Sequence, residues 1–183
     1  VGHGIGVREY AQKRQQRAEQ QRAAQESAPS HAPASRSVEF FSRTAASVFA
    51  ANGIKVHIYR EIMPTPCLSF AVRALGCAAG VMITASHNPA AYNGYKAYGS
   101  DGCQITSETA DAIQSAIENT DVFEDVKKID FDEGVSSGLI SVIPDDVYTA
   151  FTEEVKNQSL IDESIPHDCA IVYSPLHGTG LKP

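Results

Sequence analysis

No part of this sequence is apolar for long enough to cross a membrane. A transmembrane helix needs about 20 apolar residues in succession, and the first residues lack the apolar centre of a secretory signal. A chain of 183 residues, 43% of them hydrophobic, can form one buried core and the beginning of a second domain. We therefore expect a soluble, cytoplasmic protein.

Closely spaced cysteines are missing as well. The four cysteines are Cys67, Cys77, Cys103 and Cys169. Their spacing does not match the close pairs of a zinc site, and they are too scattered for the disulfide framework of a small secreted domain. Reduced thiols are therefore expected.

Positive charge is scarce after the first 30 residues. The net charge is −7, made up of +2 over residues 1–30 and −9 over the rest. Such an acidic body argues against a nucleic-acid partner, and no membrane partner is expected. An anionic ligand would have to be bound by local cations or by a metal ion.

The sequence also lacks two common catalytic loops. Gly178-Thr179-Gly180-Leu181-Lys182 has the lysine of a nucleotide-binding P-loop but neither its spacing nor the Ser or Thr that follows. Ser86 lacks the flanking glycines of the nucleophile elbow of serine hydrolases. A serine hydrolase is therefore a third hypothesis only, and we expect no turnover of an acyl ester.

Helical and extended patterns alternate after a polar head. Residues 1–37 are rich in Gln, Arg, Ala, Ser and Pro, which predicts a solvated helix or a disordered segment. A helix from Val38 should end at Asn52-Gly53. A strand over 54–59, a helix over 68–75 and a short buried strand over 80–84 follow. The apolar face expected for the first helix consists of Phe40, Phe41, Ala45, Val48 and Phe49.

The second half of the chain continues this alternation. Asn93-Gly94 predicts a tight hairpin turn and Ser100-Asp101-Gly102 another turn, with short antiparallel strands beside them. Thr106 should cap a helix over 107–118 that buries Ala110, Ile113, Ala116 and Ile117. A loop or weak helix over 121–133, a strand over 139–143, a helix over 144–157 and a strand over 169–173 complete the pattern. Residues 38–160 are thus expected to form one domain, and 161–183 the start of another.

Ser86 lies where α/β proteins place working residues, in the loop after the carboxyl end of an apolar strand. A serine hydroxyl is a weak nucleophile and needs a base, a metal ion or cations. His87 beside it, the amide of Asn88 and Lys96 across the hairpin are candidates for this help. The same residues also fit a purely structural turn in which Ser86 and Asn88 close the chain above Pro89. The local sequence leaves both interpretations open.

A longer pattern favours the catalytic interpretation. The string Thr84-Ala85-Ser86-His87-Asn88-Pro89, followed by Tyr92-Asn93-Gly94-Tyr95-Lys96, resembles the active-site signature of the α-D-phosphohexomutase superfamily, the phosphoglucomutases and phosphomannomutases. The Pro64-Thr65-Pro66 loop adds to this resemblance, and residues 174–180 are similar to the opening of the family's second domain. Bacterial members are the most similar. The resemblance implies an α/β fold, a three-layer mixed-sheet domain with helices on both faces, as in phosphohexomutase domain I.

The resemblance also implies that Ser86 carries a phosphoryl group. In the family this serine donates its phosphoryl group to a hexose phosphate, the bisphosphorylated sugar turns around, and its other phosphate returns to the serine. Hexose 1-phosphate and hexose 6-phosphate are interconverted in this way, with hexose 1,6-bisphosphate as intermediate and activator. Lys96 would stabilise the transferred charge, and Asn88 would contact the phosphate. His87 would either bind the phosphate or assist proton transfer, and the alternative is an orienting hydrogen bond within the loop. A phosphate oxygen on Ser86 would bind Mg²⁺, whereas His177 is expected to have a structural role.

Two departures from the family limit what the resemblance implies. Residues 1–36 show neither its glycine-rich segment with an active-site arginine nor its Asp-Ser-Arg-like motif, for which Ala34-Ser35-Arg36 is the nearest match. The aspartate-rich magnesium loop and the sugar-selecting loop would lie beyond Pro183. The first hypothesis is therefore domain I of a magnesium-dependent phosphohexomutase that acts within a longer chain. The alternative is an inactive fragment or pseudoenzyme that serves only as a binding module.

Overall fold

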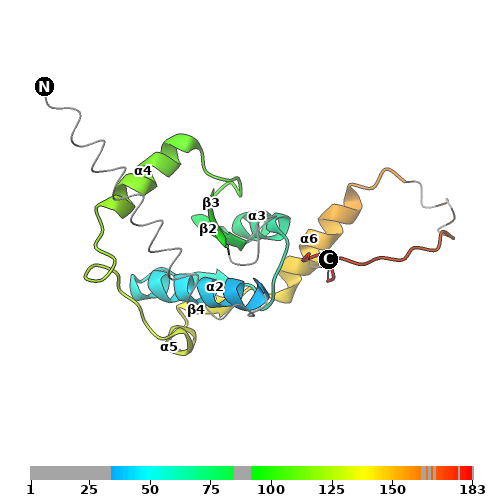
Figure 1. Ribbon diagram of the computed structural model, residues 1–183. Coiled ribbons are helices and arrows are strands. Elements are labelled where there is room, and N and C mark those ends of the chain that lie inside the picture. Colours follow the sequence, from blue (N-terminus) through cyan, green and yellow to red (C-terminus); the bar gives the residue numbers. More distant parts are fainter. Residues whose placement is uncertain are drawn as a thin grey trace, which may run out of the picture.

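The computed structural model describes residues 34–84, 92–161, 164, 166, 168–176 and 178–182. Helices and strands are interspersed along the chain (Figure 1), which confirms the α/β class. No helix within these ranges combines the length and the apolarity needed to cross a bilayer. The elements are α2 (Ala34–Ala51), β1 (Val56–Ile58), α3 (Thr65–Ala74), β2 (Ala79–Thr84), β3 (Gly94–Gly99), α4 (Ser107–Glu118), α5 (Phe131–Ser136), β4 (Ile140–Val142) and α6 (Asp145–Asn157).

The described strands form two pairs. β1 and β4 are parallel, with Val56 opposite Ile140, whereas β2 and β3 are antiparallel, with Thr84 opposite Gly94. The expected tight turn at Asn93-Gly94 is therefore wrong, because Gly94 is already the first residue of β3 and pairs with the end of β2. The turn predicted at Ser100-Asp101-Gly102 is confirmed, since Gly102 has a φ of +75° and its N–H donates to the Gly99 carbonyl.

The helix α2 packs on one face of the β1–β4 pair. Ala46 and Ala50 of α2 are buried against Ile140, and Val56 and Ile58 pack beside them. The apolar face predicted for this helix is wrong in part, because Phe40 and Phe41 are exposed. Small side chains let a helix approach a sheet closely, so the buried face follows the alanines and the buried Ser47.

A second cluster joins α3 to α6. Ala71, Ile143 and Val147 are buried together, and the rings of Phe70 and Phe151 meet edge to face with centroids 5.7 Å apart. The expected helix over 144–157 is confirmed. Pro144 lies just before the first turn of α6 and has an extended backbone. Proline is common at the start of a helix because its ring fixes φ at a suitable value.

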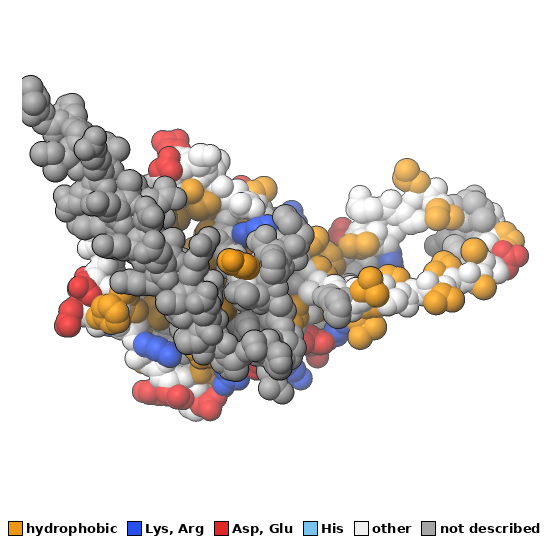
Figure 2. Space-filling model, in the orientation of Figure 1, with side chains coloured by type: hydrophobic (Ala, Val, Ile, Leu, Met, Phe, Trp, Pro, Cys, Tyr) orange, Lys and Arg blue, Asp and Glu red, His pale blue; other side chains and the backbone are white. Residues whose placement is uncertain are grey.

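Two expectations about burial and one about a strand are wrong. α4 forms at the predicted place but has no buried residue, and Ile117 is 56% exposed. β2 is half-buried rather than fully buried, since β3 alone pairs with it among the described strands. Residues 169–173 do not form a strand, because no described strand pairs with them, and Ile171 and Val172 face solvent. Figure 2 shows apolar side chains along the segment that extends from the body of the molecule.

Candidate active site

The structure describes only part of the predicted site. Ser86, His87 and Asn88 lie outside the described residues, as does His177. Lys96 is described, in the middle of β3. The geometry of the site is therefore built from the β2–β3 hairpin, which brackets residues 85–91 on both sides.

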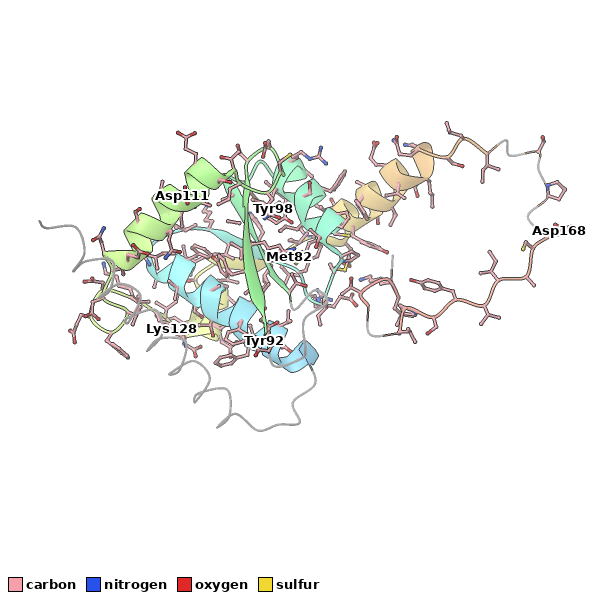
Figure 3. All side chains as sticks on the ribbon, turned by 45° about the horizontal axis from the view of Figure 1, so that its top comes forward. Met82, Tyr92, Tyr98, Asp111, Lys128 and Asp168 are labelled. Carbon is pink, nitrogen blue, oxygen red and sulfur yellow. The ribbon has the colours of Figure 1, made fainter. Side chains whose placement is uncertain are left out.

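The hairpin places Lys96 near the base of this segment. Thr84 lies opposite Gly94, and Met82 lies opposite Lys96 in the same antiparallel register. Alternate residues of a strand point to the same face, so Lys96 shares its face of the sheet with Gly94 and Tyr98. In Figure 3, Tyr98, Met82 and Tyr92 follow one another along the hairpin, with Tyr92 at the end that leads into residues 85–91.

Lys96 is a half-buried cation that is not neutralised within the described structure. Its side chain forms no hydrogen bond or ion pair with another described residue. The four salt bridges of the described chain involve Arg43, Lys156 and Lys182 instead. The Lys96 ammonium group therefore remains available to an anionic group near the hairpin.

Asn93 is a residue whose side chain the sequence did not single out. Its Oδ1 atom is buried and has no hydrogen-bond partner among the described residues. An unpaired buried acceptor is costly, by roughly 1–3 kcal/mol. The amide of Asn93 therefore suits a donor such as a hydroxyl or an N–H group close to the hairpin. In the sequence, Asn93-Gly94 indicates a turn and Asn93 belongs to the family signature, but neither pattern assigns a role to the Asn93 side chain.

The helix α3 holds the hairpin at two glycines. A Cβ atom on Gly80 would lie 2.6 Å from Cγ2 of Val72, and one on Gly102 would lie 2.5 Å from the carbonyl oxygen of Ser69. Both contacts are too close for any side chain, so the backbones of β2 and of the turn after β3 lie directly on α3. Both glycines lie at the open end of the hairpin, opposite to residues 85–91, so α3 holds the strand that carries Lys96 at that end.

Comparisons with known proteins identify the family of this segment. Residues 36–123 match the model of the phosphoglucomutase/phosphomannomutase α/β/α domain I. A phosphoglucomutase of Staphylococcus saprophyticus is 40% identical over 141 residues, which is 77% of this chain and 25% of that protein. A probable phosphoribomutase of Schizosaccharomyces pombe is also 40% identical, over 149 residues, 77% of this chain and 24% of that protein.

Residues 36–123 belong to the phosphoglucomutase/phosphomannomutase family. Within this domain I lie α3, the β2–β3 hairpin and Lys96, whereas α5, β4 and α6 follow the matched segment. The chain spans about a quarter of the length of the curated relatives that it matches. The predicted superfamily and the N-terminal position within it are confirmed.

The described part of this domain I does not form a metal centre by itself. No three His, Cys, Asp or Glu side chains among the described residues lie close enough together to hold an ion. Asn93 offers one amide oxygen near the hairpin, which is not a set of ligands. The described residues thus do not fit a magnesium site of their own.

Proposed function

We propose that this domain I carries a transferable phosphoryl group on Ser86 and takes part in the interconversion of sugar 1-phosphates and sugar 6-phosphates. The observation that carries the proposal is that Lys96, a half-buried cation without a described partner, lies at the base of the segment that contains Ser86. The membership of residues 36–123 in a family of phosphomutases supports the reaction class.

Ser86 follows Thr84, the last residue of β2, by two residues in the sequence. Thr84 pairs with Gly94, and Lys96 is two residues further along the same strand. We therefore propose that the Lys96 side chain reaches a phosphoryl group on Ser86.

The proposed transfer breaks the bond between the Ser86 Oγ atom and phosphorus and forms a bond between phosphorus and a sugar hydroxyl oxygen. The hydroxyl proton leaves as this bond forms, and His87 is proposed to accept it and to return it to Ser86. Negative charge spreads over the phosphoryl oxygens during transfer, and a lysine ammonium group stabilises that charge. In the second half the other phosphate of the sugar returns to Ser86 by the same steps.

The acidic charge of the chain makes this local cation necessary. Residues 31–183 carry −9, so the chain as a whole repels a sugar phosphate. Lys96 offsets this repulsion at one point, and Asn88 is proposed to donate from its amide group to the phosphate. Mg²⁺ is proposed to bind an oxygen of the Ser86 phosphate together with ligands that the described residues do not supply.

The sugar is proposed to be a hexose, and the relatives supply an alternative. Two relatives share the same sequence identity of 40% with this chain, and one is named a phosphoglucomutase and the other a probable phosphoribomutase. Loading of Ser86 from glucose 1,6-bisphosphate and from ribose 1,5-bisphosphate should therefore be compared directly. Faster loading from ribose 1,5-bisphosphate would indicate a pentose phosphate as the substrate in place of a hexose phosphate, and the proposed role of Ser86 would stay the same.

The role of Lys96 is tested by the rate at which Ser86 becomes phosphorylated. Lys96→Met should slow this loading strongly, because it removes the cation that offsets the transferred charge. Lys55→Met is the matched control, since Lys55 is exposed and precedes β1. Equal loading rates in the two variants would remove Lys96 from the proposal. Reversible binding of the bisphosphate without any covalent phosphate would support the binding module instead.

A further inference from the structure

The chain leaves the body of the molecule after α6 and then returns to it. Figure 1 shows the segment after α6 looping outward and its end lying back near the beginning of α6, and Figure 3 places Asp168 at the far side of this loop. The outward part is solvated, since Leu160 is fully exposed and Ile171 is 81% exposed. The return must therefore be held by contacts near its end.

Lys182 makes these contacts. Its Nζ atom forms an ion pair with the Glu61 carboxylate and lies 5.2 Å from the centroid of the Tyr148 ring, and its carbonyl oxygen accepts a hydrogen bond of 2.8 Å from the Tyr148 hydroxyl. Between residues 168 and 182, every described hydrogen bond, ion pair and ring contact with the chain before residue 160 involves Lys182. A single residue thus anchors the returning segment.

The anchor occupies the carboxyl edge of the parallel strand pair. Glu61 follows β1, and Ile143 and Asp145 follow β4, and these loops line a small cavity together with Tyr148 and Lys182. The cavity has a volume of about 110 Å³. Acidic side chains and an aromatic face are the groups that hold an ammonium ion. The hydrogen bond to Glu61 raises the pKa of Lys182, which keeps the anchor charged.

The residues before Lys182 form a closed turn. The Tyr173 hydroxyl donates to the Gly180 carbonyl at 2.8 Å, and the Gly178 N–H donates to the Pro175 carbonyl at 2.8 Å. Leu176 has a φ of +49°, which non-glycine residues rarely adopt, so the turn holds one strained residue in place. Because the turn is closed on itself, the position of Lys182 sets the position of the whole turn.

We propose that Lys182 is a latch that docks the turn formed by residues 173–176 and 178–180 onto the body of the molecule, with Glu61 and Tyr148 as its receptor at the carboxyl edge of β1 and β4. The latch is a positioning device and does not depend on the chemistry proposed for Ser86. Its ion pair is solvent-exposed, with 44% of the Lys182 side chain and 52% of the Glu61 side chain accessible. Exposed pairs weaken at high salt, so the latch opens as the ionic strength rises.

A nitroxide label next to the anchor tests this proposal in the full chain. Leu181 is 80% exposed, and Leu181→Cys can carry the label after the three accessible cysteines, Cys77, Cys103 and Cys169, are replaced by serine. In the latched chain the label should broaden the backbone NMR signals around Glu61 and Tyr148. Lys182→Ala should abolish this broadening, whereas Lys156→Ala, which removes a salt bridge on α6, should leave it unchanged.

Charge reversal distinguishes a latch from a general loss of folding. Glu61→Lys alone should abolish the broadening, and the double variant E61K and K182E should restore part of it, because the pair is then attractive again although Asp145 and the Tyr148 ring now face an anion. High salt should reduce the broadening in both latched forms. Broadening that persists in Lys182→Ala, or that the double variant fails to restore, would overturn the proposal.

Discussion

Gly102→Ala is expected to weaken the hold of α3 on the hairpin that carries Lys96. Gly102 has a φ of +75°, and a Cβ atom there would lie 2.5 Å from the carbonyl oxygen and 2.9 Å from the hydroxyl of Ser69. The left-handed conformation costs an alanine roughly 1–2 kcal/mol. Forcing the Cβ atom against a backbone carbonyl adds about 1–3 kcal/mol. The free energy of unfolding should therefore fall by about 2–5 kcal/mol.

Gly138→Ala is the matched control for this substitution. Gly138 has the same φ of +75°, but no heavy atom of the described residues, apart from Gly138 and its two chain neighbours, lies within 4 Å of the Cβ position. The two variants share the conformational cost, so their difference measures the contact with α3 alone. Urea unfolding followed by circular dichroism gives both free energies. If Gly102→Ala costs no more than Gly138→Ala, the close packing of the hairpin turn on α3 is refuted.

Two further predictions concern α3 and the loop before it. Cys67 is fully buried and its burial raises the pKa of the thiol, so iodoacetamide should modify the exposed Cys103 and Cys169 long before Cys67; equal rates would contradict this. Burial, and after it the nearby Cys67, raises the pKa of Tyr59 from 10.0 to about 12. The unfolded chain then loses this proton first, so the stabilisation is complete below pH 10 and disappears as the pH rises to 12. Over that range the wild type should lose up to about 2 kcal/mol more stability than Tyr59→Phe, and less if solvent screens the partly exposed ring. Parallel plots of unfolding free energy against pH for the wild type and Tyr59→Phe would exclude this contribution of the Tyr59 hydroxyl.

Local sequence signals predicted α6 well because they coincide at its ends. Pro144 sits just before the first turn, acidic side chains follow it, and Lys156 lies in the last turn, where it complements the helix dipole. Val147 of this helix is buried, whereas Val155 of the same helix is 55% exposed. Helix ends depend on neighbours in sequence, whereas burial depends on what packs against the helix.

The hairpin shows why strand pairing could not be predicted. Asn93-Gly94 is a strong local turn signal, yet the pairing of Thr84 with Gly94 makes it the start of a strand. The strand expected over 169–173 failed for the related reason that a strand forms only with a partner. Likewise the Lys96 ammonium group and the Asn93 oxygen, which have no partner among the described residues, and the anchor at Lys182 depend on how distant segments pack.

The family, by contrast, could be predicted from a short stretch of sequence. The resemblance rested on the residues from Thr84 to Lys96, and these lie inside the matched segment of residues 36–123. A motif of chemically distinctive residues at fixed spacing can be recognised even where the hydrophobic periodicity is ambiguous, because each of its residues has a specific role at the site. The roles of Ser86, His87 and Asn88 remain predictions of this resemblance.

The intact mass of the protein, expressed from its complete gene, tests the central claim most directly. The mass is measured before and after incubation with hexose 1,6-bisphosphate, for the wild type and for Ser86→Ala. The wild type should gain the mass of one phosphoryl group, and Ser86→Ala should gain none. No gain in the wild type, or an equal gain in Ser86→Ala, would contradict the assignment of Ser86 as the phosphoryl carrier.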